Sequence, residues 1–286
     1  MASKTVISAS RRTDIPAFYM PWLMRRLELG FVETENPFNA RKTTLDLRPE
    51  SVHSIVLWSK NYSPFIDGCY AEKITGMGYR LFFQFTLNAR SIILEPGVPC
   101  LRARLEQAGN LSKIHGPEAI EWRFDPVCFF MEKGRGLVSN NLAGFEEIAS
   151  SMSRIGISRC VTSFLDIYRK LKKREENAGI RFIEPDSETK LRTIEYMHGV
   201  LKKFGMKLRL CCESGLLGDS PEIKEFITPG GCIDSRLLMD IHGGSISTRP
   251  DKGQRKTKGC TCTESRDIGS YRTQPCFHNC LYCYAA

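Results

Sequence analysis

The chain has 286 residues, of which 42% are hydrophobic and 26% are charged, a composition typical of a globular protein with a sizeable buried core. Its apolar runs are shorter than a membrane span and its N-terminus lacks a signal-peptide core, so we expect a cytoplasmic protein that does not enter the membrane. The formal charge of +9 favours an anionic or small-molecule substrate, with nucleic acid as a less favoured partner.

Strand-like and helix-like segments alternate six times along the first 214 residues. Strands are predicted at residues 5–10, 53–58, 81–88, 119–126, 160–166 and 207–213, and helices at residues 18–29, 63–76, 98–115, 137–154, 166–178 and 187–204. A hairpin is predicted within residues 31–50. This alternation indicates an α/β protein with right-handed βαβ units. It favours a partial (β/α)6 TIM-like barrel, and a doubly wound open sheet is the alternative.

Polar residues concentrate where these strands end, at the edge where active sites form in parallel sheets. Arg123 and Asp125 share one face of a predicted strand and are the best single pair. With Asp166 they are the predicted catalytic residues. Each polar residue taken alone is more typical of a cap or a turn. The predicted cofactor-binding residues of the same edge are Arg11, Asp14, Lys60 and Gln84.

Residues 215–286 lack the alternating pattern and contain many cysteines. Eight of the twelve cysteines lie from Cys211 onward, which points to metal binding in a protein without signs of export. We therefore expect two domains, a partial barrel over residues 1–214 and a cysteine-rich tail over residues 215–286, with short helices near 220–227 and 233–241.

The last cysteines form the pattern Cys276-x3-Cys280-x2-Cys283. Three thiols on one short loop can hold three corners of a 4Fe-4S cluster and leave one iron open, and an open position invites a substrate or cofactor. The spacing resembles the cluster loop of the radical S-adenosylmethionine (SAM) enzymes, in which SAM binds the open iron and is cleaved reductively. Tyr282 would pack beside the cluster. The alternatives are a purely structural cluster, or a zinc site with His278 or Cys262 as fourth ligand.

Four cysteines outside this loop could form a second closed site, either an auxiliary 4Fe-4S cluster or an all-thiolate zinc site. Alternation along residues 207–213 places Cys211 on the polar face and predicts Cys212 to be a core thiol. A basic run over residues 252–258 precedes the next cysteines and would favour thiolates. The predicted ligands are Cys211, Cys232, Cys260 and Cys262.

Several motifs together resemble the family called domain of unknown function 1848. They are Ser8-Ala-Ser-Arg-Arg-Thr-Asp-Ile-Pro16, Asn36-Pro-Phe-Asn39, Trp58-Ser-Lys-Asn61, Trp122-Arg-Phe-Asp-Pro126, and the tail from Cys260-Thr-Cys262 through Tyr284. The resemblance covers essentially the whole chain and implies a radical-SAM-like cluster loop. Ordinary radical SAM enzymes carry this loop after the first strand, so its place at the chain end implies a circular permutation. A Gly-Gly-Glu stretch after the second strand is also missing.

The leading hypothesis is thus an iron-sulfur enzyme that cleaves SAM reductively, with an electron donor of the flavodoxin or ferredoxin class. One rival is a binding or sensor protein whose iron-sulfur or zinc sites are saturated. The other is a nucleic-acid repair enzyme resembling spore photoproduct lyase, suggested only by the positive charge and the cysteine loop.

Overall fold

A computed structural model describes residues 4–36, 39–134, 136–217, 227–253 and 259–284. Most of the helix predicted near 220–227, and the basic residues at 254–258, lie outside these ranges. Within them, no helix has the length and apolar character needed to cross a membrane.

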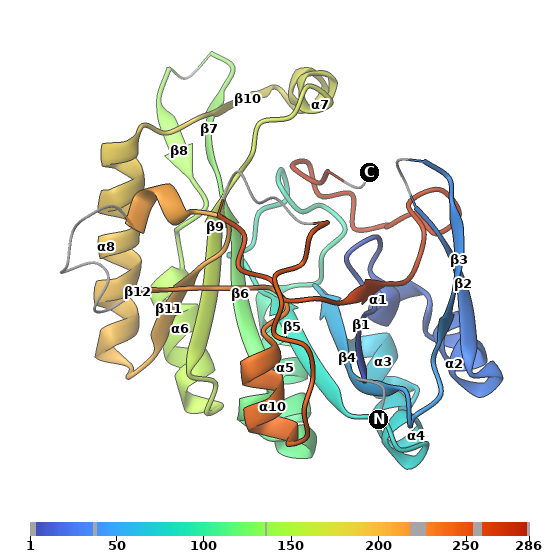
Figure 1. The fold of residues 1–286 in the computed structure, drawn as a ribbon. Coiled ribbons are helices and arrows are strands. Elements are labelled where there is room, and N and C mark those ends of the chain that lie inside the picture. The colour runs from blue at the N-terminus through green and yellow to red at the C-terminus, as the bar shows by residue number, and fades with distance from the viewer. Residues whose placement is uncertain (1–3, 37–38, 135, 218–226, 254–258, 285–286) are drawn as a thin grey trace.

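A parallel sheet of eight strands organises the molecule (Figure 1). This confirms the predicted α/β class. The strand order rises steadily from β1 to β12, without the reversal that defines a doubly wound sheet, and β13 adds on the far side of β1. The sheet is open, because β12 and β13 form its two edges in the described part of the chain. In spatial order the strands are β12 (Ile227–Pro229), β11 (Lys207–Leu210), β9 (Arg159–Phe164), β6 (Ile120–Val127), β5 (Leu81–Thr86), β4 (Val52–Ser59), β1 (Thr5–Ser8) and β13 (Arg266–Asp267).

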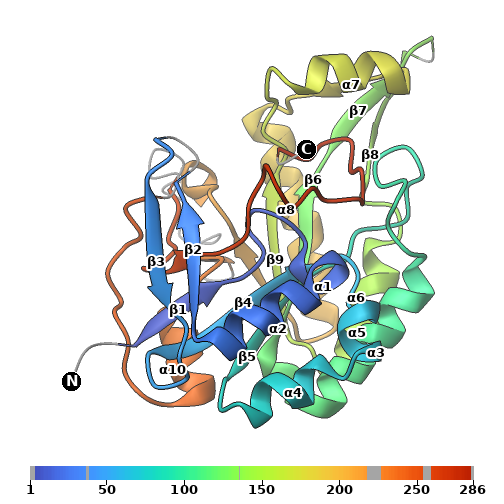
Figure 2. The same cartoon turned by 90° about the vertical axis from the view of Figure 1, so that its right-hand side faces the viewer.

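One face of the sheet packs against the connecting helices, which Figure 2 shows together on that side. Alternate strand residues such as Phe83, Trp122 and Leu208 point into this core and are fully buried. The helices are α1 (Ile15–Phe18), α2 (Met20–Leu29), α3 (Ser63–Asp67), α4 (Tyr70–Gly76), α5 (Leu101–His115), α6 (Phe145–Arg154) and α8 (Ser187–Lys203), with 3-10 turns η1 (Pro117–Ala119) and η2 (Ser214–Leu217).

The opposite face changes character along the strands. Near the amino ends, Val56 and Phe82 pack with Leu238 of α10 (Ser235–His242) in a small apolar core. One step further, the same face carries Gln84 and Glu121, whose side chains hydrogen-bond at 2.7 Å. Apolar packing therefore closes the lower half of this face, and polar side chains occupy the half nearer the carboxyl ends.

The smaller elements differ in how well the sequence predicted them. The hairpin of β2 (Phe31–Glu35) and β3 (Lys42–Asp46) is confirmed. A second sheet of β10 (Ile180–Ile183), β7 (Phe129–Glu132) and β8 (Val138–Asn140), beside α7 (Leu171–Ala178), was not predicted. The helix predicted over 137–154 is wrong in its first turns, where β8 lies. The helices predicted over 18–29 and 63–76 are each divided in two.

The tail returns to the main sheet at two places. β12 extends one edge beside β11, and β13 pairs in parallel with β1, with Ile7 opposite Arg266. The terminal segment then crosses the carboxyl ends of the strands, on the side of α7 and β7 (Figures 1 and 2). Residues 276–284 are thereby brought to the edge where the predicted polar residues gather.

Candidate functional site

A cavity of about 350 Å³ lies at the carboxyl ends of the strands, beneath the terminal segment. Of the predicted residues, Gln84, Cys260 and Cys262 lie outside its wall. The others all line it, and they are Arg11, Asp14, Lys60, Arg123, Asp125, Asp166, Tyr282, Cys211, Cys232, Cys276, Cys280 and Cys283.

The three cysteines of the terminal loop face this cavity together. Cys280 is buried, and Cys276 and Cys283 are half-buried. Burial raises the pKa of Cys276 to about 11, and that of Cys280 to about 12 although Lys60 opposes the rise. Cys276 and Cys280 therefore lose their protons at neutral pH only when a partner such as a metal centre stabilises the thiolate.

Asp14 joins the loop to the first and second strands of the alternating series. Its carboxylate caps α1 by accepting from the Ala17 amide at 3.0 Å. It also accepts from the Ser59 hydroxyl at 2.9 Å, the Lys60 amide at 3.1 Å and Nε2 of His278 at 2.9 Å. Both Asp14 and His278 are buried. The side chain of Asp14 thus holds the cysteine loop.

A second buried network holds the other end of the loop. Glu95 accepts from Lys60 Nζ at 2.8 Å, from Asn88 at 2.8 Å and from the Tyr282 hydroxyl. Arg104 lies 4.0 Å away. Burial favours the neutral carboxyl, but Lys60, Tyr282 and Arg104 together outweigh it and lower the pKa of Glu95. Lys60 and Tyr282 therefore bind Glu95. The sequence did not predict Glu95 as a site residue, because it lies in a segment without periodicity.

Backbone contacts complete the attachment of the loop to residues 91–98. The Leu281 amide donates to the Leu94 carbonyl at 2.8 Å, and the Gly97 amide donates to the His278 carbonyl at 3.0 Å. A Cβ on Gly97 would lie 2.7 Å from the carbonyl oxygens of Phe277 and His278, so this approach requires glycine.

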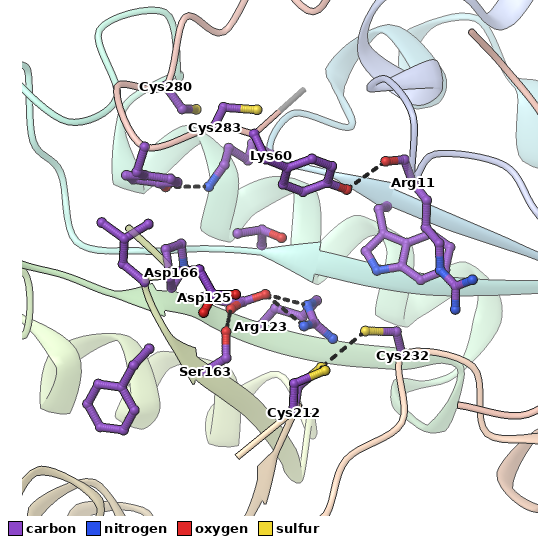
Figure 3. Close-up of a pocket in the computed structure, with 18 of the residues that line it drawn as sticks. Arg11, Lys60, Arg123, Asp125, Ser163, Asp166, Cys212, Cys232, Cys280 and Cys283 are labelled. Atoms are coloured by element: carbon purple, nitrogen blue, oxygen red, sulfur yellow. Dashed lines mark hydrogen bonds and ion pairs between the residues drawn. The ribbon is translucent and has the colours of Figure 1, made fainter. Parts of the chain in front are cut away.

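Arg123 and Asp125 occupy the middle of the cavity, as the sequence predicted for a pair on one face (Figure 3). Their ion pair measures 2.7 Å, and Ser163 donates to the other oxygen of Asp125 at 2.5 Å. Gln84 supports the pair from below by accepting from Arg123 at 3.3 Å. Asp166 lines the same cavity but accepts a hydrogen bond from Tyr168 at 3.3 Å. The structure therefore joins Arg123 and Asp125 in an ion pair, and Asp166 lines the same cavity with Tyr168 as a hydrogen-bond partner.

The second cysteine set lies on the opposite side of the cavity from the terminal loop, with Arg123 and Asp125 between them (Figure 3). Cys211 Sγ lies 3.4 Å from Cys232 Sγ and 3.9 Å from Cys212 Sγ. The Cys232 amide donates to Cys262 Sγ at 3.1 Å. Hydrogen bonds between thiols also join Cys260 to Cys212 and to Cys262. Five free thiols thus form a ring of neighbours, called the thiol ring below.

The prediction of Cys212 as a core thiol is wrong. It lines the cavity and is half-buried, with a φ of 59°. β11 ends at Leu210, so the two-residue alternation no longer applies at this position. The left-handed backbone, which is uncommon for a cysteine, turns the Cys212 thiol toward the ring.

The hydrogen bonds within the ring also set its charge. Bonds from Cys211 and Cys262 lower the pKa of Cys232, and bonds from Cys212 and Cys262 lower that of Cys260 to about 3. Arg123 and Arg11 add to the effect on Cys232. The same bonds raise the pKa of Cys211 and Cys262, so thiolate is favoured at Cys232 and Cys260 and the protonated thiol at Cys211 and Cys262.

In the described ranges, no three His, Cys, Asp or Glu side chains are arranged to hold a single metal ion. An iron-sulfur cluster differs from a single ion, because its thiolates bind separate irons. Thiolates are soft ligands that select such clusters, zinc or Cu(I). By donor chemistry, the terminal loop fits a cluster with three cysteine ligands.

The chain belongs to the family described as domain of unknown function (DUF1848), whose model matches residues 6–285. This confirms the resemblance that the sequence motifs indicated. No curated protein matches the chain.

Proposed function

We propose that this member of the family is a radical-SAM-like iron-sulfur enzyme whose terminal loop holds a 4Fe-4S cluster through Cys276, Cys280 and Cys283. One observation carries the proposal: three thiols of a single loop face a cavity at the carboxyl edge of a parallel sheet. Three ligands leave one iron free to bind a cofactor.

The connection between sheet and loop also supports this proposal. β13 lies in parallel beside β1, and the cysteine loop follows β13 along the chain. A parallel strand followed by the cysteine loop is the order expected of a radical SAM enzyme. In this chain the strand and the loop lie near the C-terminus, and not after the first strand. The steady strand order from β1 to β11 is likewise the order of a partial six-stranded barrel. Both features favour a circularly permuted, radical-SAM-like fold.

Some residues around the loop would hold it in place, and others would bind SAM or the substrate. Asp14, Lys60 and Tyr282 make hydrogen bonds that hold the loop in place, so they would position its three thiols. Arg11 stacks over Trp58 at 5.6 Å on the cavity wall, where ion pairs with Asp267 at 3.3 Å and Asp251 at 3.5 Å fix its position, and it would offer SAM a cationic wall. Arg123 and Asp125 lie deeper, where a substrate would meet them. When bound, a reduced 4Fe-4S cluster would supply the electron that cleaves the sulfonium of SAM.

The test is anaerobic reconstitution with iron and sulfide, followed by electron paramagnetic resonance (EPR) of the dithionite-reduced protein with and without SAM. We expect a reduced-cluster signal that changes when SAM is added, and formation of 5′-deoxyadenosine without any further substrate. Cys280→Ala should abolish the SAM-dependent change and the product.

Cys100→Ala is the matched control, because Cys100 is an exposed thiol outside the cavity wall. It should retain both the signal and the product. A reduced-cluster signal that is indifferent to SAM, or a Cys280→Ala variant that still forms 5′-deoxyadenosine, would contradict the proposal and favour a binding or sensor protein.

A further inference from the structure

We propose that the thiol ring is a second metal centre, which binds an additional iron-sulfur cluster on the opposite side of the cavity from the terminal loop. Its ligands come from Cys211, Cys212, Cys232, Cys260 and Cys262. The inference goes beyond the proposed function, because it concerns different residues and does not require SAM.

The ring contains enough thiols for a cluster. A structural zinc takes four ligands that converge on one point, and no three donors of the described residues converge in this way. In the ring, Cys211 Sγ lies 3.4 Å from Cys232 Sγ and 3.9 Å from Cys212 Sγ, so these neighbours would move apart to bind separate irons. A 4Fe-4S cluster needs four thiolates on four different irons, so its ligands surround a volume. The ring provides one thiol more than that number.

The surroundings of the ring suit an anionic cluster with thiolate ligands. Arg123 is buried and lines the cavity together with Cys211, Cys212 and Cys232. Arg11 lines the same cavity and is fixed by ion pairs with Asp267 at 3.3 Å and Asp251 at 3.5 Å. Two fixed cations therefore offset negative charge that the five thiols would concentrate there.

The backbone brings three distant segments together for this ring. β12 pairs with β11 and is followed by Gly231 and Cys232. A Cβ on Gly231 would lie 3.0 Å from the carbonyl oxygens of Thr261 and Ile233. The Thr263 amide donates to the Ile233 carbonyl at 3.0 Å, which holds the segment of Cys260 and Cys262 beside that of Cys232. The thiols meet because of this framework, and a bound cluster would join its three segments.

The location gives the second cluster a defined relation to the first. Cys211, Cys212 and Cys232 line the same cavity as the terminal cysteines, with Arg123 and Asp125 between the two sets (Figure 3). A molecule in the cavity would therefore lie between two iron-sulfur centres.

The experiment separates the two centres by substitution. A variant with Cys276, Cys280 and Cys283 all changed to alanine keeps only the ring, and after anaerobic reconstitution it should bind about four irons and about four sulfides per chain. Adding Cys232→Ala and Cys262→Ala should remove them. Iron, sulfide and zinc are measured in each protein, and circular dichroism verifies that each is folded.

A second arm leaves the terminal loop intact. Cys232→Ala with Cys262→Ala alone should lower the iron content about twofold, from about eight to about four per chain, and leave any SAM-dependent EPR change in place. The control is the double change Cys69→Ala and Cys100→Ala at two exposed thiols, and it should lose no iron. Unchanged iron in the ring variant, or one zinc without sulfide in the ring-only variant, would overturn the inference. A signal indifferent to SAM with normal iron content would count only against the proposed function.

Discussion

The two cysteine sets face the same cavity but are positioned by different means. The terminal loop carries its three thiols within eight consecutive residues, and side chains from the first hundred residues hold it. The thiol ring draws on three segments, with Cys211 and Cys262 lying 21 and 30 residues from Cys232. Its thiols depend on the pairing of β11 with β12 and on backbone contacts at the sheet edge.

This difference implies different behaviour when each set is disturbed. The terminal loop rests on buried polar contacts, so the loss of one carboxylate or one close approach can release it while the sheet remains. The thiol ring is part of the sheet edge, so it should loosen only when that edge does. Variants that act on one set and spare the other therefore test the comparison directly.

The largest effect is expected from Glu95→Ala. Glu95 is 5% exposed and compensates Lys60 and Arg104, so its removal leaves buried cations without a partner. Breaking a buried ion pair in this way costs about 3–5 kcal/mol. Urea unfolding should show that loss, and the terminal loop should lose its iron before the ring does.

Glu146→Ala is the control for Glu95→Ala. Glu146 pairs with Lys203 at 2.8 Å, but both side chains are at least half exposed. Removing such a surface pair costs at most about 1 kcal/mol. If Glu95→Ala were as mild as Glu146→Ala, the buried network would not be what holds the loop.

The same contrast explains what could be predicted from the sequence. The terminal loop was recognised because its ligands are neighbours in the chain, and Arg123 with Asp125 because two residues two apart share a strand face. The parallel strands follow from short apolar runs that end in polar residues. In each case the information is local.

The features that were missed depend on contacts between distant residues. Glu95 has its partners 35 and 187 residues away, at Lys60 and Tyr282. Cys212 was misassigned because β11 stops at Leu210, which alternation alone does not reveal. The strands of the small sheet, β10, β7 and β8, are three or four residues long, and Val138 in β8 is exposed, so no period could be recognised.

A matched pair of glycine variants should separate the two sets with intermediate effects. Gly97→Ala would force a Cβ to 2.7 Å from two carbonyl oxygens of the terminal loop, and Gly231→Ala would force one to 3.0 Å from two carbonyl oxygens beside the ring. Overpacking of this kind costs about 1–3 kcal/mol. We expect Gly97→Ala to weaken iron binding by the terminal loop, and Gly231→Ala to weaken binding by the ring.

Iron retention during dialysis against a chelator measures this separation, with the SAM-dependent EPR change reporting on the terminal loop. Gly109→Ala is the control, because a Cβ there meets nothing within 4 Å. Equal loss of iron from both cysteine sets in both glycine variants would mean that the loop and the ring unfold together. That result would contradict their independent positioning.

The smallest effect concerns acid and α10, the helix that begins three residues after Cys232 of the ring. His242 ends α10, and its ring centroid lies 6.4 Å from that of His53. Burial, followed by His53 and Arg80, lowers the pKa of His242 to about 4, while the Leu81 backbone and Glu118 oppose this weakly. The folded protein thus binds fewer protons here than the unfolded chain. Its contribution to stability is present above pH 6.5 and is lost as the pH falls toward 4.

Thermal unfolding at pH 7 and pH 4.5 measures this loss. The wild type should lose about 2–4 °C more than His242→Gln over that interval, which corresponds to about 1 kcal/mol for a domain of 150–250 residues. His198→Gln on α8 is the control, because His198 lies on the helix-covered face and has its pKa lowered less. The released iron should come from the ring first, since α10 follows Cys232 in the chain and packs through Leu238 on Val56 and Phe82 of β4 and β5. Iron lost first from the terminal loop would instead show that acid acts through the loop contacts.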